Sequence, residues 1–183
     1  ANTPEKQLKY LETIRDKSDE LEKLIERLFL FSKLNVQAPV LVTASFDLGA
    51  EVKRIVGQVK DEYAQAGLTI EITNELPAVT VEMDPMLLNM ILVNIFENSL
   101  KYKERPHVRL GVDVTIEGEN IKIILADDGP GVPEENLNDI FEIFYRCDKA
   151  RSNPGKGSGL GLAIIAKTIM QLGGKVWPEK VAG

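Results

Sequence analysis

The sequence predicts an α+β protein: a two-layer α/β sandwich with helices on one face of a largely antiparallel sheet, preceded by a long bundle-forming helix. Two observations predict this architecture. The first 35 residues carry an unbroken helical repeat, whereas the following residues mix helical and strand patterns without a strict β–α–β alternation. A chain of 183 residues, 44% of them hydrophobic, can bury one core and carry such an appendage.

The leading helix is predicted from Pro4 to about Leu34, within a first unit of residues 1–35. A stripe of mostly apolar residues, the seam of this helix, recurs at alternating spacings of three and four among mostly charged neighbours. It comprises Leu11, Ile14, Ser18, Leu21, Ile25 and Leu28. Leu24, Phe31 and Leu34 widen this stripe, which favours a helix of a four-helix bundle over a solitary coiled coil. The periodicity alone leaves open an amphipathic helix that covers the core of its own domain.

A linker and the first elements of a second unit follow. Residues 36–45 contain a proline and little periodicity, so we expect a linker there. Asp47 can cap a helix that runs to about Ala66 and is ended by Gly67. The alternating segment Leu68–Thr73 then predicts a strand.

A long apolar helix is predicted in the middle of the chain. A short strand is expected after Pro77, and Asp84 with Pro85 supplies the cap and the first turn of a helix that ends near Tyr102. The later stretches HVRLGVDVTI and NIKIILAD predict a strand hairpin. A glycine-rich turn, a short helix from Pro133 and a helix over about 159–172 complete the chain.

Composition excludes several classes of function. The net charge of -6 argues against a nucleic-acid interface, because binding a phosphate backbone needs clustered Lys and Arg in excess. The single cysteine, Cys147, excludes an internal disulfide and agrees with a reducing compartment. No apolar run has the length that spans a bilayer. We therefore expect a cytoplasmic piece, attached to a membrane only through N-terminal regions outside this sequence.

The helix that ends near Tyr102 carries a polar stripe. Asn94, Asn98 and Lys101 lie on one helical face, at spacings of four and three. Burying an amide without partners costs about 1–3 kcal/mol, so two amides on one stripe indicate a wet or liganded groove. An amide oxygen can coordinate Mg²⁺, and a lysine can neutralise phosphate. The asparagines could equally satisfy the backbone ends of a neighbouring loop.

The segment ADDGPGVP ends the second strand of the predicted hairpin. Gly129 and Gly131 allow a flat ligand to approach the backbone, and Asp127 can accept a hydrogen bond from an exocyclic amine such as that of adenine. From this segment alone, a tight strand-to-helix turn is the simpler interpretation, because Asp-Gly-Pro-Gly is ordinary turn chemistry.

The segment GKGSGLGLAI leads directly into the last predicted helix. Bare backbone amides at a helix start bind anions with help from the helix dipole, and Lys156 adds a positive charge. The sequence lacks the P-loop, the dinucleotide fingerprint and the HRD and DFG kinase motifs. A flexible glycine linker is the alternative, although linkers rarely run straight into an apolar helical pattern.

In this order, the asparagine helix, the DxGxG turn and the GxGxG loop resemble the ATP-binding domain shared by histidine kinases, DNA gyrase, MutL and related ATPases. The intervening IFEIFYR, residues 140–146, is similar to the phenylalanine box of histidine kinases. The leading helix, ending LIERLFLFSKLN, resembles the second helix of their dimerisation and phosphotransfer hairpin. The resemblance therefore implies a sensor histidine kinase of a two-component system, with part of that hairpin in residues 1–35 and the catalytic domain in 46–183.

The resemblance implies a site for ATP and Mg²⁺. Asn98 would coordinate the metal, Asn94 would lie beside the phosphates, Lys101 and Arg146 would contact phosphate, and Tyr102 would line the pocket. Asp127 would bind the adenine amine, with Gly129 and Gly131 keeping the turn close. Gly157, Gly159 and Gly161 would form the hinge and anion-binding end of a mobile lid over about 145–158, and Lys156 and Leu160 would also bind the nucleotide.

The sequence also departs from the family pattern. The phosphoacceptor of such kinases lies on the first helix of the hairpin, and this sequence begins after that helix. His107, beside Pro106, is expected to be a structural or surface residue. The final strand of the family is expected to be missing after LGGKVWPE. We therefore expect ATP binding without self-phosphorylation, homodimerisation through the hairpin of the intact protein, and phosphotransfer to a response regulator receiver domain.

Two other functions compete with this one. A stand-alone ATPase or anti-sigma-type serine kinase of the same superfamily would use the same nucleotide motifs, and the leading bundle helix argues against it. A non-catalytic interaction module would retain the helix but not the pocket. The intact glycine and asparagine motifs argue against that second alternative.

Overall fold

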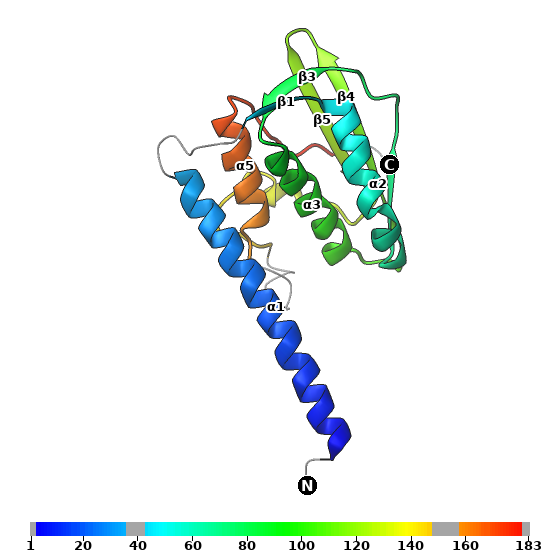
Figure 1. The fold of residues 1–183 in the computed structure, drawn as a ribbon, viewed down its shortest axis with the longest axis vertical. Helices are drawn as coiled ribbons and strands as arrows, with labels where there is room; N and C mark the ends of the chain where they lie inside the picture. The colour runs from blue at the N-terminus through cyan, green and yellow to red at the C-terminus, as the bar shows by residue number, and fades with distance from the viewer. Residues whose placement is uncertain (1–2, 36–42, 148–157, 181–183) are drawn as a thin grey trace.

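The computed structural model describes residues 3–35, 43–147 and 158–180. A long helix, α1 (Pro4–Asn35), leads to a body of helices and strands (Figure 1). Most of the predicted linker lies outside the described residues. Its last two residues, Ala44 and Ser45, instead begin strand β1 (Ala44–Asp47), which corrects the prediction. A strand of four residues is too short to show a reliable alternation in the sequence.

The strands form two small sheets. In the larger sheet, β2 (Leu68–Ile72) runs parallel to β4 (Val108–Glu117), and β4 pairs antiparallel with β5 (Asn120–Asp127). In the smaller sheet, β1 pairs antiparallel with β3 (Thr80–Met83). Both antiparallel pairings and the mixed helix and strand order agree with the predicted α+β class.

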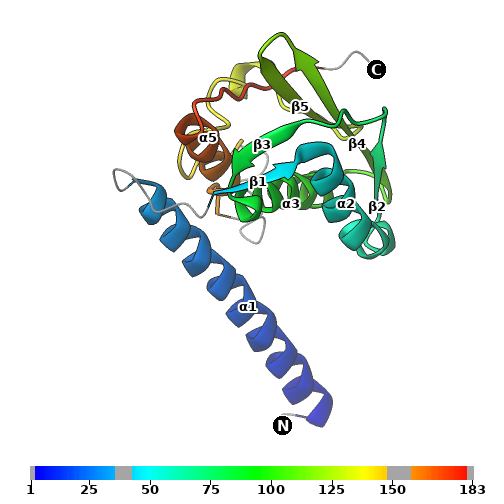
Figure 2. The ribbon, with the colours of Figure 1, turned by 45° about the horizontal axis from the view of Figure 1, so that its top comes forward.

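Helices cover one face of the larger sheet. α2 (Leu48–Gln65) and α3 (Pro85–Tyr102) lie across it, and α5 (Gly161–Gln171) packs beside α3 (Figures 1 and 2). The short helix predicted from Pro133 is a single 3₁₀ turn, η1 (Glu134–Asn136). The layered arrangement that the sequence predicts is therefore present.

The core lies between α2, α3 and the sheet. Three fully buried side chains of α3, Leu88, Leu92 and Phe96, belong to its apolar cluster together with residues of β4 such as Leu110. Tyr63 of α2 packs edge-on against the Phe96 ring, with the ring centroids 5.7 Å apart. This packing fixes α3, and α3 carries the polar stripe singled out in the sequence.

The predicted helix caps are confirmed. The Asp47 carboxylate accepts a hydrogen bond from the Ala50 amide at 2.6 Å, and the Asp84 carboxylate accepts one from the Met86 amide at 2.9 Å. Gly67 follows α2 with a φ of 92°, as a glycine terminator requires. These caps fix where α2 and α3 begin, and therefore the register of the residues along them.

α1 packs against α5 of the body. Both views show its first half extending away from the rest of the molecule (Figures 1 and 2). The seam side chains Leu11, Ile14 and Leu21 are each more than half exposed. No helix in the described part of the chain combines the length and the apolar character needed to cross a bilayer.

Candidate functional site

The polar stripe of α3 meets the last glycine motif at the start of α5. Asn94 is buried, and its Nδ2 donates a hydrogen bond to the Met90 carbonyl oxygen at 2.9 Å. Its Oδ1 lies so close to Gly161 that a Cβ added there would be 2.9 Å away. The first and third motifs are therefore in contact, and the absence of a side chain at Gly161 permits that contact.

The DxGxG turn is attached to α3 through a side chain that the sequence did not single out. The buried Ser99 hydroxyl donates to Asp127 Oδ2 at 2.5 Å. The Gly129 amide donates to Asp127 Oδ1 at 2.9 Å. Ser99 directly follows Asn98, so this bond joins the second motif to the first. Nothing local in the sequence indicates the pair, because its two members come from different elements.

Gly129 and Gly131 serve the turn in different ways. A Cβ on Gly129 would lie 2.7 Å from Asp127 Oδ1, so this glycine is needed for the approach of the carboxylate. Gly131 has open space where its Cβ would be and adopts a φ of 69°, so it is needed for its backbone conformation. The predicted approach of a ligand to the backbone at Gly129 and Gly131 stays a prediction.

Asp128 fastens the same turn to the beginning of β4. Its carboxylate accepts a hydrogen bond from the Arg109 amide at 2.7 Å, and the Arg105 guanidinium lies 3.4 Å from it. The hydrogen bond from the Arg109 amide lowers the pKa of Asp128. Burial opposes this shift, and the positive charges of Arg105 and Arg109 add to it. Because Asp128 is held by β4, its neighbour Asp127 is left at the α3 side of the turn.

A second group of predicted residues converges at the end of α3. The Lys101 ammonium lies 5.0 Å from the centre of the Tyr102 ring. Burial raises the pKa of Tyr102, the positive charge of Arg146 opposes that shift, and Cys147 adds to it. Arg146 and Cys147 therefore lie close to Tyr102, although they follow it by a whole hairpin in the chain. His107 is exposed, as expected.

The loop before α5 is held at a backbone contact. The Phe144 amide donates to the Gly159 carbonyl oxygen at 3.1 Å. Gly159 has a φ of 72°, and a Cβ there would lie 2.7 Å from the Phe144 carbonyl carbon. This conformation explains why the helix begins at Gly161 rather than near Gly159. Most of the predicted lid over 145–158 lies outside the described residues, and this part includes Lys156 and Gly157.

The start of α5 has the features expected of an anion site. Within the described residues, Leu160 makes no side-chain cap, and the first turn of α5 has no acidic residue. The Leu160 side chain is fully buried in a cluster with Ile164 and Met90. Leu160 therefore anchors the start of α5 with its side chain.

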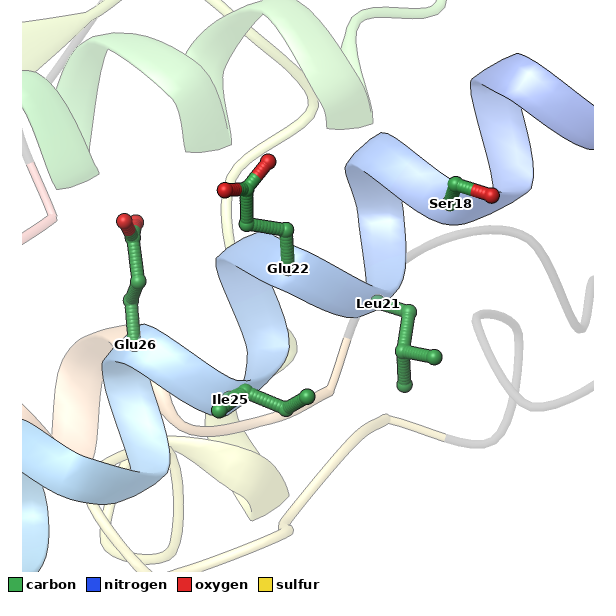
Figure 3. Close-up of a pocket in the computed structure, with 5 residues that line it drawn as sticks. All are labelled: Ser18, Leu21, Glu22, Ile25 and Glu26. Carbon is green, nitrogen blue, oxygen red and sulfur yellow. The ribbon is translucent and has the colours of Figure 1, made fainter.

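A hollow on α1 lies apart from all of these motifs. It is lined by Ser18, Leu21, Glu22, Ile25 and Glu26 (Figure 3). The two glutamates project side by side from one side of the helix, and the two aliphatic side chains from another. A pair of carboxylates repels phosphate, so this hollow does not compete with the α3 site for a nucleotide.

Comparison with known proteins identifies the class to which this fold and site belong. Residues 83–183, more than half of the chain, match the model of the histidine kinase-, DNA gyrase B- and HSP90-like ATPase family, so the chain belongs to that family. Within it, the chain contains a histidine kinase ATP-binding catalytic domain.

Individual relatives agree with this assignment. The sensor histidine kinase WalK of Bacillus subtilis (strain 168) is 38% identical over 62% of this chain and 19% of its own length. The sensor protein VanS of Enterococcus faecium is 32% identical over 93% of this chain and 44% of its own. Crystalline full-length ShkA, solved in complex with AMPPNP, is 25% identical with a TM-score of 0.73, over 93% of this chain and 35% of that one. The chain thus spans less than half the length of these relatives.

Proposed function

We propose that this chain is the ATP-binding catalytic part of a sensor histidine kinase, which binds ATP with Mg²⁺ and delivers the γ-phosphoryl group to a histidine outside this sequence. A response regulator aspartate would receive the group next. One observation carries the proposal: α3 contacts both the DxGxG carboxylate, through Ser99, and the glycine start of α5, through Asn94. The AMPPNP complex of ShkA supports the choice of nucleotide.

The residues present fit a purine at one end of this site. Asp127 is exposed, and each of its two carboxylate oxygens accepts one hydrogen bond from the described residues. A carboxylate oxygen can accept two hydrogen bonds, so Asp127 retains the capacity to bind the adenine amine. Gly129 leaves the space beside the carboxylate that a larger residue would fill.

The residues at the other end fit a triphosphate and its metal. Asn98 is half-buried on the same side of α3 as Asn94 and would offer its amide oxygen to Mg²⁺. Lys101 and Arg146 would neutralise phosphate charge, and Tyr102 would cover the nucleotide. Phosphoryl transfer requires mainly such positioning and neutralisation. When bound, Mg²⁺ would offset the charge that develops as the acceptor nitrogen bonds to phosphorus and the bond to ADP breaks.

The proposal also covers the dimerisation and the location of the intact protein. The exposed seam of α1 supports a helical hairpin that pairs two copies of the intact protein. We place the domain in the cytoplasm, where its nucleotide is available. Attachment to a membrane would depend on segments outside this sequence.

The purine end is tested by Asp127→Ala. Mg²⁺ with AMPPNP should raise the melting temperature of the natural chain, and the substitution should remove most of that rise. Loss of a charge-assisted hydrogen bond should weaken affinity about ten- to hundredfold. Asp61→Ala, at an exposed position of α2, is the matched control and should behave like the natural chain. An unchanged shift in Asp127→Ala would refute the pocket.

The acceptor is tested separately, with a longer protein that includes the preceding helix of the hairpin. Incubation with Mg²⁺ and labelled ATP should give an acid-labile product, as phosphohistidine is. Labelling of serine or threonine alone, in a protein that still binds ATP, would contradict the histidine kinase assignment and favour the anti-sigma-type alternative.

A further inference from the structure

Ser99 has a contact that the proposed function does not by itself explain. It lies on α3 directly after Asn98 and is only 7% exposed, whereas its partner Asp127 is exposed. The distance of 2.5 Å between Ser99 Oγ and Asp127 Oδ2 is that of a charge-assisted hydrogen bond. An ionised carboxylate only accepts, so the hydroxyl must be the donor.

This bond and the bond from Gly129 together fix the carboxylate plane. The Gly129 amide holds Asp127 Oδ1 at 2.9 Å, while Ser99 holds Oδ2. Rotation about the last torsion of an aspartate is otherwise broad. With both oxygens held, the free lone pairs point in set directions. What Asp127 presents to a ligand is a fixed acceptor, and the Ser99 hydroxyl is not available there as a donor.

We propose that Ser99 is a positioning residue that sets the preference of this site for 6-amino over 6-oxo purines; the inference rests on the proposed nucleotide site. A 6-amino group donates to the fixed oxygen of Asp127. A 6-oxo group would place a second acceptor against it, and a site built for one hydrogen-bonding pattern strongly rejects the other. Without Ser99, the carboxylate can rotate and admit water between itself and the base, so the two purines become harder to distinguish.

A purely structural role predicts a different result. If Ser99 only fastened β5 to α3, its removal would affect the whole site. All nucleotides would then lose affinity to the same extent, together with some stability of the protein. The ratio of two affinities separates these cases, because nucleotides that share the triphosphate and Mg²⁺ differ only at the base.

The test is isothermal titration of the chain with ATP and with ITP, each with Mg²⁺. ITP differs from ATP in carrying a 6-oxo group in place of the amine. For Ser99→Ala we expect the affinity for ATP to fall about three- to tenfold and the affinity for ITP to change less than about twofold. The ratio of the affinity for ATP to that for ITP should therefore fall. Ser99→Thr, which keeps a hydroxyl, should restore the preference, and Ser99→Cys, a weaker donor, should be intermediate. Ser45→Ala, an exposed serine of β1, is the control.

Two outcomes would overturn the inference and are distinguishable from each other. If Ser99→Ala and Ser99→Cys lower the affinities for ATP and ITP by the same factor, the ratio of the two affinities is unchanged. Ser99 then does not set the preference, and the proposal of a nucleotide site is unaffected. If the natural chain binds neither nucleotide, the proposed function fails and the inference fails with it.

Discussion

The two sides of α3 differ in what they contact. One side presents Leu88, Leu92 and Phe96 to the core, all fully buried. The other side carries Asn94, Asn98 and Lys101, and of these Asn94 lies against Gly161 at the start of α5. Packing of the apolar side against the core fixes the position of α3, and this position determines where the polar side chains lie. Substitutions of these apolar side chains should therefore change stability, and substitutions of these polar side chains should change affinity.

The largest expected effect is on the core side. Phe96→Ala removes a fully buried ring that packs against Tyr63, so the free energy of unfolding should fall by about 3–5 kcal/mol. Urea unfolding measures this change. Ile116→Ala, at a half-exposed position of β4, is the control and should cost far less. If the folded fraction of Phe96→Ala lost affinity for ATP as strongly as Asp127→Ala does, the separation of the two sides would not hold.

The next effect is expected where the polar side meets α5. Gly161→Ala would place a Cβ 2.9 Å from Asn94 Oδ1, so the amide must move. Such overpacking typically costs about 1–3 kcal/mol, and we expect ATP affinity to fall about fivefold or more. Calorimetric titration measures the affinity, and thermal unfolding shows whether the fold is kept.

The matched control for Gly161→Ala is Gly57→Ala on α2, where a Cβ would meet nothing within 4 Å. It should stabilise the helix by about 0.5–1 kcal/mol and leave affinity unchanged. Equal affinities for ATP in the two variants would show that the contact between Asn94 and Gly161 does not contribute to binding.

A smaller effect is expected from Lys101→Ala, because this side chain is partly exposed and its charge is screened. ATP affinity should fall about threefold at low salt and less than that at high salt, since screening weakens charge pairing. Adenosine, which lacks phosphates, should bind both proteins equally. A loss that is the same for adenosine and ATP would place Lys101 outside the phosphate end.

The smallest effect at neutral pH is expected at the edge of the core. Burial, with added effects of the Glu97 and Glu62 carboxylates, raises the pKa of Tyr63 to about 12 from an ordinary 10.0. Folded Tyr63 keeps its proton where unfolded Tyr63 has lost it, so stability is unaffected below pH 10 and falls as the pH rises through about 12. Denaturant unfolding across this range measures the fall. Tyr63→Phe should show a smaller one, and an identical fall in both proteins would contradict the shift.

The parts of the fold that depend on local chemistry could be predicted from the sequence. The aspartate caps of α2 and α3, the glycine that ends α2 and the alternation of β2 all act within a few residues. Strand β1 escaped prediction because its pairing with β3, rather than its own pattern, makes it a strand. The start of α5 was placed two residues early, because the backbone contact between Gly159 and Phe144 cannot be inferred from local sequence.

In the site, too, local motifs could be predicted and contacts between distant segments could not. The motifs predict which residues would contact ATP, but they do not indicate which residues hold those in place. Ser99 is an unremarkable small residue of a helix until β5 brings Asp127 to it. The approach of Arg146 to Tyr102 likewise depends on the path of the chain after the hairpin. Contacts between distant segments are set by tertiary packing, which a single sequence does not reveal.

The central claim is most directly tested by a crystal structure of this chain grown with Mg²⁺ and AMPPNP. The account predicts the adenine amine within hydrogen-bonding distance of Asp127, the metal bound to the Asn98 amide oxygen, and the phosphates between α3 and the start of α5. A nucleotide bound elsewhere, or an adenine that makes no contact with Asp127, would contradict it.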